Sequence, residues 1–219
     1  MSRLPIAILI SGRGSNMRVI AERAATGILP VDVHVVVSDK PSADGLRIAQ
    51  AMNITTRVLE PRNFPDRPAY DRALVELLAQ YQPQLIVLAG FMRILTPQFI
   101  GAFAGRMLNV HPSLLPKYPG LHTHRRCLEA GDTAHGVSIH FVTEQLDGGP
   151  VVLQTEVPVL PGDTEITLSA RVQQAEHRIY PQAVDWFARG RLVLQDGRAW
   201  LDGKPLDTPL REPSPPAGG

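Results

Sequence analysis

Two polar side chains at the end of an apolar stretch, Asn109 and His111 in RMLNVHP, could together stabilise negative charge. Residues i and i+2 of a β-strand point to the same face, so we expect this pair side by side, with Val110 turned away. An amide donates two hydrogen bonds, and a protonated imidazole donates another and carries charge. The pair therefore suits an oxyanion that forms on a carbonyl carbon. The residues alone leave open a buried Asn–His pair that caps the edge of a sheet.

Proline stiffens the segment after this pair, because Pro112 favours an extended conformation at His111 and two more prolines follow by residue 119. Ser113 is close to His111, but the sequence has no Gly-x-Ser-x-Gly elbow, so a serine hydrolase is not favoured. Five of the seven histidines lie between residues 111 and 140. They come without an HExxH or Cys-x-x-Cys pattern, so we expect no metal site.

A carboxylate that could support the imidazole is Asp147, in the turn sequence EQLDGGP. Next to His111 it would orient the ring, favour the charged form and pass a proton through water. The spacing does not show whether the two groups are close. An aspartate that merely forms the turn is the alternative.

A glycine-rich loop, SGRGSN (11–16), joins an apolar strand to a helical segment. Gly12 and Gly14 allow a tight turn, and N–H groups at the start of the next helix can bind an anion, with Ser15 and Asn16 as further donors. A dinucleotide fingerprint would need glycine where Met17 stands, and no Gly-Lys-Ser/Thr follows for a Walker loop. The loop is therefore interpreted as a phosphate site of a general kind, or as a plain turn that needs glycine for its geometry.

Short apolar runs alternate with amphipathic stretches over the first half of the chain. We expect strands at 5–10, 31–38, 55–60, 84–90 and 106–111 and helices at 15–26, 42–52, 66–81 and 97–104. This alternation predicts an α/β fold with a doubly wound, mostly parallel, twisted sheet. Ligands of such sheets bind outside the carboxyl ends of the strands, which is where Asn109 and His111 lie.

The second half has a different pattern. Runs at 135–143 and 148–159 predict an antiparallel extension of the sheet. A long helix is expected from about Asp163 to Arg189, with Gly190 as its stop. Its inward stripe would be Leu168, Val172, Ala175 and Ile179. A short hairpin should follow at 191–203. We expect one domain over residues 1–204 and a disordered Pro/Gly-rich tail over 205–219.

Composition excludes several classes of protein. The 219 residues are 44% hydrophobic with a formal charge of +1, so no general surface for nucleic acid or an anionic membrane is indicated. The longest apolar runs, 4–10 and 85–92, are far shorter than the ~20 residues of a membrane span. Cys127 is the single cysteine, so an intrachain disulfide is impossible, and we expect a semi-buried helix residue. A cytoplasmic protein with small-molecule substrates, monomeric or weakly dimeric, is expected.

Several stretches, in chain order, resemble motifs of the folate-dependent glycinamide ribonucleotide formyltransferases: SGRGSN, DRPAYD (66–71), LAGFMRIL (88–95), LNVHPSLLPKYPGLHTH (108–124), HFVTEQLDGGPV (140–151) and ARVQQAEHRIYP (170–181). HPSLLP and LDGGP mark only the wider superfamily that uses formyltetrahydrofolate, whereas the glycine loop, PGLHTH and QAEHRIYP are more particular. The resemblance covers roughly residues 5–203. It implies a Rossmann-like formyltransferase that moves the formyl group of 10-formyltetrahydrofolate to the amine of glycinamide ribonucleotide in purine biosynthesis.

The resemblance also implies roles for particular residues. Asn109, His111 and Asp147 match the catalytic trio. Gly12, Gly14, Ser15 and Asn16 would hold the ribonucleotide phosphate, and Glu176 its ribose hydroxyls. The folate would lie against Asn109, Asp147 and the following residues: Arg67, Met92, Arg93, Ile94, Leu95, Val142, Thr143, Glu144, Gln145 and Leu146. Residues 1–105 would then form a ribonucleotide-binding half, and residues 106–204 a catalytic and folate-binding half.

Two alternatives remain open. Within the superfamily, a methionyl-tRNA formyltransferase normally has a basic C-terminal domain, and a formyltetrahydrofolate hydrolase an N-terminal regulatory one, whereas here we expect only a hairpin and a tail around one domain. In another class, a non-catalytic dinucleotide-binding module could use Asp39 as its ribose contact. Met17 argues against that module, and it gives no reason for Asn109 and His111.

Overall fold

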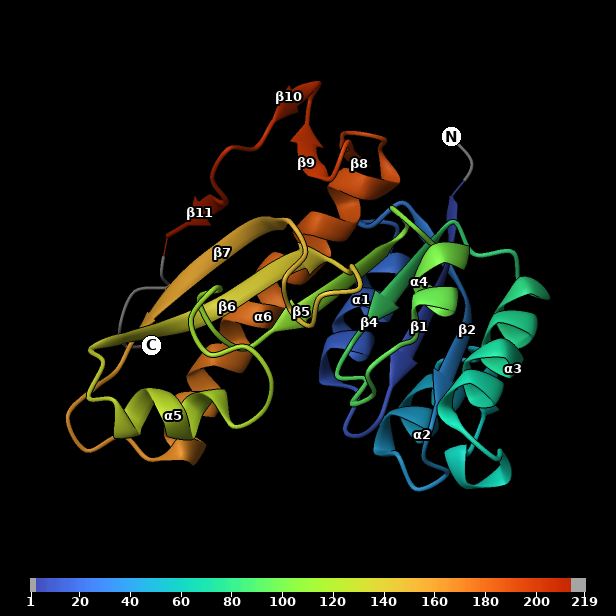
Figure 1. Ribbon diagram of the computed structural model, residues 1–219, viewed down its shortest axis with the longest axis horizontal. Coiled ribbons are helices and arrows are strands. Elements are labelled where there is room, and N and C mark those ends of the chain that lie inside the picture. The colour runs from blue at the N-terminus through green and yellow to red at the C-terminus, as the bar shows by residue number, and fades with distance from the viewer. Residues whose placement is uncertain (1–2, 214–219) are drawn as a thin grey trace.

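One eight-stranded sheet organises the chain (Figure 1), in a computed structural model that describes residues 3–213. The strand order is β11-β7-β6-β5-β4-β1-β2-β3. Five neighbouring strands are parallel: β1 (Leu4–Ile10), β2 (Val31–Ser38), β3 (Thr56–Val58), β4 (Leu85–Leu88) and β5 (Met107–His111). The antiparallel extension consists of β6 (Ala134–Phe141) and β7 (Val151–Pro158). The predicted fold class is thus confirmed.

Helices cover both faces of the sheet (Figure 1). They are α1 (Ser15–Ala25), α2 (Asp44–Ala51), α3 (Arg67–Ala79), α4 (Pro97–Ala102), α5 (Thr123–Glu129) and α6 (Glu165–Ala188), with one 3-10 turn, η1 (Pro61–Asn63). The expected helix ranges included neither α5 nor η1, although a helix was expected at Cys127. Cys127 lies in α5, as expected for a helix residue, but it is completely buried and not semi-buried.

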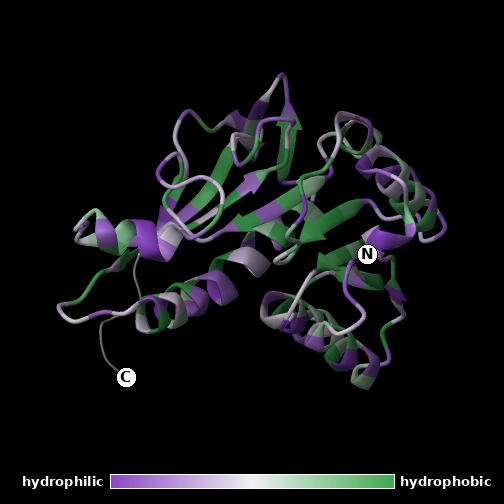
Figure 2. Cartoon of the chain, turned by 60° about the horizontal axis from the view of Figure 1, so that its bottom comes forward, coloured by the Kyte–Doolittle hydropathy of each residue, from purple (hydrophilic) through white to green (hydrophobic). Residues whose placement is uncertain are grey.

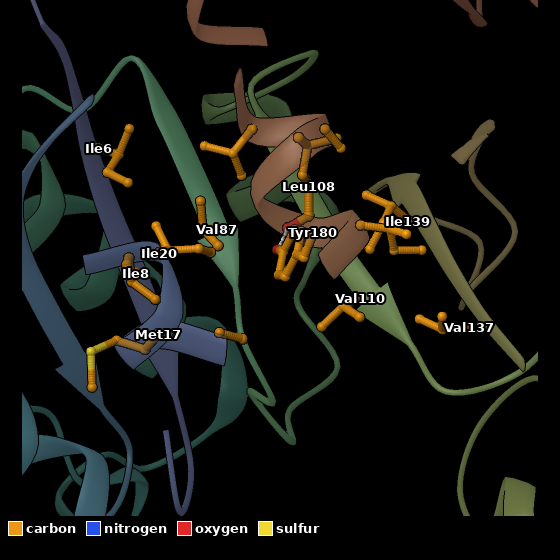
Figure 3. Close-up of a cluster of buried hydrophobic side chains, with 14 of the residues drawn as sticks. Ile6, Ile8, Met17, Ile20, Val87, Leu108, Val110, Val137, Ile139 and Tyr180 are labelled. Atoms are coloured by element: carbon orange, nitrogen blue, oxygen red, sulfur yellow. Dashed lines mark hydrogen bonds between the residues drawn. The ribbon is translucent and has the colours of Figure 1, made fainter. Parts of the chain in front are cut away.

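The core has two parts because alternate residues of each central strand point to opposite faces. Ile6 and Ile8 of β1 pack under α1, α2 and α6, whereas Ala7 and Leu9 pack under α3 and α4. Figure 3 shows the first cluster, where Tyr180 of α6 lies against residues of β4, β5 and β6. The central strands are hydrophobic along most of their length in Figure 2, while the helices alternate between hydrophobic and hydrophilic residues.

The long helix α6 lies on the core as its pattern predicts. Leu168, Val172, Ala175 and Ile179 are each fully buried. Thr164 caps its first turn, because the Thr164 hydroxyl accepts a hydrogen bond from Thr167 N and the Thr167 hydroxyl accepts one from Thr164 N. Among the described residues, no helix has the length and apolar character that crossing a membrane requires.

The C-terminal segment departs from the expected tail. After α6 a separate antiparallel sheet follows, formed by β8 (Leu192–Gln195), β9 (Arg198–Leu201) and β10 (Lys204–Pro205). The chain then returns to the main sheet, where β11 (Leu210–Glu212) pairs in parallel with β7. Part of the expected tail therefore has regular structure, because Pro205 pairs with β9 and the edge of β7 offers backbone partners to residues 210–212. Residues 214–219 of the expected tail lie outside the described residues.

Candidate active site

The polar pair at the end of β5 lies where the sheet changes from parallel to antiparallel. β5 pairs with β4 on one side and with β6 on the other, and Asn109 faces His140 across the β5–β6 ladder. Val110 packs into the core (Figure 3). His111 is buried and Asn109 is half-buried.

His111 has an acceptor oxygen at each ring nitrogen. Its Nε2 lies 2.9 Å from the backbone carbonyl oxygen of Tyr118, which can only accept, so Nε2 donates. Its Nδ1 lies 3.4 Å from Oδ2 of Asp147. Asp147 is fixed in turn, because the backbone N–H of Gly120 donates to the same Oδ2 at 2.8 Å. The structure therefore brings together an imidazole and a carboxylate that lie 36 positions apart in the chain.

The Asp147 turn depends on glycine. Asp147 has a φ of 49°, in the left-handed region, and the chain must then return beside β6. An added Cβ at Gly149 would lie 1.9 Å from the carbonyl oxygen of Phe141, a distance that backbone atoms do not tolerate. Only glycine allows this approach, so Gly149 fixes the position from which the Asp147 carboxylate reaches His111.

Asn109 is oriented by a residue that the sequence analysis did not single out, His140. The His140 Nδ1 donates to the carbonyl oxygen of Phe141 at 2.9 Å, which leaves Nε2 as an acceptor for the Asn109 amide at 3.0 Å. Burial lowers the pKa of His140 to about 4, so the ring is neutral at pH 7. One amide hydrogen of Asn109 is thus used to fix its orientation, and the amide has a second hydrogen for another acceptor. Only the register between β5 and β6 places His140 opposite Asn109, and a sequence pattern does not give that register.

The proline-rich loop after His111 is held by its neighbours. The Ser113 hydroxyl donates to the Lys117 carbonyl at 2.6 Å, and Ser113 is fully buried. Ser138 of β6 donates to the Ser113 carbonyl at 2.7 Å and accepts from Leu115 N at 3.0 Å. Ser113 is therefore a structural residue, and its hydroxyl does not face an open site.

The glycine loop lies opposite α6. Asn16 donates to Glu176 Oε2 at 2.7 Å, and Gln173, one helical turn earlier, donates to the Ser15 hydroxyl at 3.1 Å. Burial raises the pKa of Glu176. Within the described part of the chain, the buried Asn16 Oδ1 has no hydrogen-bond partner. The loop, its helix N-terminus and the Glu176 carboxylate thus form one polar site. Sequence reasoning missed Gln173, although its spacing of three from Glu176 places both on one helix face.

The two glycines of the loop differ in whether the structure leaves room for a side chain. Gly14 has a φ of 69°, and an added Cβ would lie 2.6 Å from the Gly45 Cα, so only glycine fits. An added Cβ at Gly12 would meet no atom within 4 Å. Packing therefore requires Gly14 but not Gly12.

A pocket opens beside Asn109 and Asp147. Its lining combines the β4–α4 segment, the end of β6 and the following turn: Leu88, Phe91, Arg93, Ile94, Leu95, Ile100, Asn109, His140, Val142, Thr143, Glu144, Gln145, Leu146 and Asp147. All but two of the expected folate residues line it. Arg67 begins α3 and Met92 is 66% exposed, and neither is part of the lining.

The pocket and the glycine loop each draw on both expected halves of the chain. Residues before and after position 105 line the pocket, and Asn16 pairs with Glu176. The sheet also runs without a break from β4 to β5. The pocket and the polar site at the glycine loop therefore each lie across the boundary between residues 1–105 and 106–204.

The histidine-rich segment is linked by hydrogen bonds. His135 Nε2 lies 3.1 Å from His124 Nδ1, and burial lowers the pKa of His135 to about 4. Among residues 3–213, we find no group of three His, Cys, Asp or Glu side chains arranged to hold a metal ion.

Comparisons with known proteins agree on one family. The formyl transferase family model matches residues 4–184. The chain is 53% identical over 201 residues to the phosphoribosylglycinamide formyltransferase of Escherichia coli (strain K12), covering 92% of this chain and 95% of that protein. It is 41% identical over 198 residues to the trifunctional purine biosynthetic protein adenosine-3 of Bos taurus, covering 90% of this chain and 20% of that protein. The solved phosphoribosylglycinamide formyltransferase of Coxiella burnetii matches with a TM-score of 0.90 at 45% identity, covering 95% of this chain and 99% of that one.

Proposed function

This chain belongs to the formyl transferase family, and from that premise we propose that it transfers the formyl group of 10-formyltetrahydrofolate to the amino group of glycinamide ribonucleotide. The products are formylglycinamide ribonucleotide and tetrahydrofolate, in purine biosynthesis. The resemblance expected from the motifs is confirmed by the family match and by the similarity to the Escherichia coli enzyme.

One observation supports the assignment of the site most directly. The His111–Asp147 pair and the Asn109 amide lie at one end of the sheet, and Asn109 and Asp147 also line the pocket. A transfer between two ligands requires a place for each beside the reacting groups. The pocket offers one place, and the glycine loop with Glu176 offers the other.

The proposed chemistry is direct attack. The substrate amine bonds to the formyl carbon, and a tetrahedral intermediate forms with its negative charge on the formyl oxygen. The Asn109 hydrogen not used by His140 donates to this oxyanion, and the positive charge of the protonated His111 stabilises it. Asp147 supports the charged imidazole and relays a proton from the attacking amine to the leaving nitrogen through water. The bond from the formyl carbon to that nitrogen then breaks, and no covalent enzyme intermediate is needed.

The ribonucleotide is proposed to lie against the glycine loop. Gly14 is the N-cap of α1 and Ser15 and Asn16 begin it, where backbone N–H groups and the helix dipole favour a phosphate. Gly12 would allow the backbone to approach the ligand. The Glu176 carboxylate would accept from ribose hydroxyls. The unpartnered Asn16 Oδ1 supports a ligand with a donor at this point.

The folate is proposed to occupy the pocket. Arg93, Ile94, Leu95, Val142, Thr143, Glu144, Gln145 and Leu146 would contact it together with Asn109 and Asp147. The apolar and polar side chains mixed in this lining suit a ring system with a polar edge. Arg67 and Met92, which do not line the pocket, are proposed to contact the part of the folate that extends beyond it. We further propose that the protein is a monomer or weak homodimer in the cytoplasm.

The test measures tetrahydrofolate release from 10-formyltetrahydrofolate with and without glycinamide ribonucleotide. Release that requires the ribonucleotide supports the proposal. Release without it would indicate a formyltetrahydrofolate hydrolase, and transfer only to methionyl-tRNA would indicate that formyltransferase. NAD(H) binding without turnover would indicate the dinucleotide-binding module.

Site variants test the catalytic assignment. Asn109→Ala, His111→Ala and Asp147→Ala should fold and lose about a hundredfold or more in kcat. Loss of one group that stabilises the oxyanion costs ~3 kcal/mol, and Asp147→Ala removes the support of the charged imidazole and the proton relay. His34→Ala is the control, since His34 lies on β2, where its side chain contacts Asp32 and the Tyr81 carbonyl. Turnover close to wild type in Asp147→Ala would refute the catalytic assignment.

A further inference from the structure

We propose that Ser11 is a positioning residue that couples the glycine loop (11–16) to the segment 89–96, named here the β4–α4 loop. The inference rests on the proposed function, because it concerns how the ribonucleotide and folate sites influence each other. Through Ser11, a ligand that orders one loop favours the conformation of the other.

Ser11 makes two hydrogen bonds across the two loops. Its backbone N–H donates to the Gly90 carbonyl at 3.0 Å, and its hydroxyl oxygen accepts from the Met92 backbone N–H at 2.9 Å. Ser11 is 6% exposed, so water does not replace these bonds easily. It is also the first residue of the glycine loop, directly after β1. A shift of that loop therefore moves both partners in the other one.

The far end of the β4–α4 loop is anchored independently. Thr96 N donates to Asp71 Oδ2 at 2.6 Å, and Asp71 is a buried residue of α3. Between the two anchors, the side chains of Met92 and Ile94 are 66% and 52% exposed. The Arg93 guanidinium lies 4.5 Å from the Tyr70 ring centre. The loop is thus fixed at both ends, while its middle presents apolar surface and a cation beside the pocket.

The two anchors have different consequences. The loop carries no regular secondary structure, so its conformation depends on these bonds and on the buried side chains of Phe91 and Leu95. Ser11 connects it to the proposed ribonucleotide site, whereas Asp71 connects it to α3. Loss of the Ser11 hydroxyl should weaken folate binding and also reduce the effect of the ribonucleotide on it. Loss of the Asp71 carboxylate should weaken folate binding alone.

The experiment measures the dissociation constant of tetrahydrofolate by calorimetry, with and without glycinamide ribonucleotide. Tetrahydrofolate has no formyl group, so the ternary complex does not turn over. The ratio of the two constants is the coupling factor, and linkage requires the same factor for the ribonucleotide. With the constant measured without the ribonucleotide as numerator, the wild-type factor is expected to exceed 1, because each ligand then favours the binding of the other.

Ser11→Ala should bring the coupling factor towards 1. It should also weaken the binding of tetrahydrofolate in the ternary complex about two- to tenfold, the usual effect of one hydrogen bond. Ser11→Thr keeps the hydroxyl and should restore the factor. Asp71→Asn should weaken tetrahydrofolate while the factor stays as in wild type. Ser38→Ala is the matched control, because this buried serine also ends a strand, and its hydroxyl accepts from Lys40 N at 3.1 Å. It should leave both constants unchanged.

Two results would overturn the inference: a wild-type factor of 1, or an unchanged factor in Ser11→Ala. A purely structural role for Ser11 would lower the melting temperature and leave the factor intact, which is the second of these results. If Ser11→Ala does not fold, Ser11→Cys takes its place, since sulfur is a weaker acceptor of similar size. Failure of the proposed function is distinguished by the turnover assay, because the wild type would then show no tetrahydrofolate release that requires glycinamide ribonucleotide.

Discussion

Lowering the pH from 7 to 5 should destabilise the fold through two buried neutral histidines, His135 and His140. Burial lowers the pKa of each to about 4, and the nearby His124 and His111 lower that of His135 further. An exposed histidine titrates near ~6.5. The unfolded chain therefore binds protons before the folded one does as the pH falls. The stability that the neutral rings contribute is complete above about pH 6.5 and is lost as the pH falls towards 4.

The size of the effect follows from the width of that window. Each histidine changes the free energy of unfolding by about 1.4 kcal/mol per pH unit between the two pKa values. From pH 6.5 to pH 5 this amounts to about 2 kcal/mol per residue and about 4 kcal/mol for the pair. Both side chains are almost completely buried, at 1% and 2% exposure, so solvent screening reduces the effect little. The loss is a large part of the ~5–15 kcal/mol that stabilises a typical domain.

Urea unfolding at pH 7, 6 and 5, followed by circular dichroism, measures directly how steeply the free energy of unfolding falls with pH. His135→Gln should reduce the loss between pH 7 and 5 by about 2 kcal/mol relative to wild type, whatever its absolute stability. Ile139→Val, at a buried position of the same strand, is the control and should cost about 1 kcal/mol equally at every pH. If His135→Gln, His140→Gln and wild type lose stability in parallel, the two histidines are not buried in the neutral form and the reasoning fails.

Two further variants test the packing around the site. Gly149→Ala should destabilise the fold by about 1–3 kcal/mol and lower kcat at least tenfold, because its Cβ would overlap the Phe141 carbonyl and displace the Asp147 turn. Gly101→Ala, in α4 with no atom within 4 Å of the added Cβ, is the control, and thermal melts should show it equal or slightly stabilised. Tyr180→Phe should lower the free energy of unfolding by about 1–2 kcal/mol. The Tyr180 hydroxyl donates to the Leu88 carbonyl at the end of β4, at 3.1 Å, and to the Leu108 carbonyl in β5, at 2.8 Å. An unchanged urea midpoint for Tyr180→Phe would contradict this.

Local patterns were enough to predict the fold and the polar strand end. The period of two that pairs Asn109 with His111 is a property of one strand, and the alternation of apolar runs with helices specifies a parallel sheet. Both needed only neighbouring residues. The distance from His111 to Asp147 depends instead on how the β6–β7 connection closes, which involves the approach of Gly149 to another strand. The sequence could suggest the carboxylate but not its position.

Two features depended on partners that composition does not reveal. The Asn109–His140 bond follows from the β5–β6 register, and a slip by one residue would have placed another side chain opposite. The order of residues 210–213 depends on a docking site far from them in sequence. β11 pairs with the edge of β7, and Arg178 of α6 donates to the Pro213 carbonyl and lies 3.4 Å from Glu212. A Pro-rich segment buries little apolar surface by itself, which is why its composition predicted disorder.

The three proposed catalytic side chains share a form of support that bears on their kinetics. Asn109 donates to His140, His111 donates to the Tyr118 carbonyl, and Asp147 accepts from the Gly120 N–H. Each is oriented by another group of the protein, so the cost of ordering it is met during folding and not during the reaction. Loss of a supporting group should therefore lower kcat more than it raises KM. The loops held by Ser11 and Asp71 position the ligands themselves, so changes there should act mainly on KM.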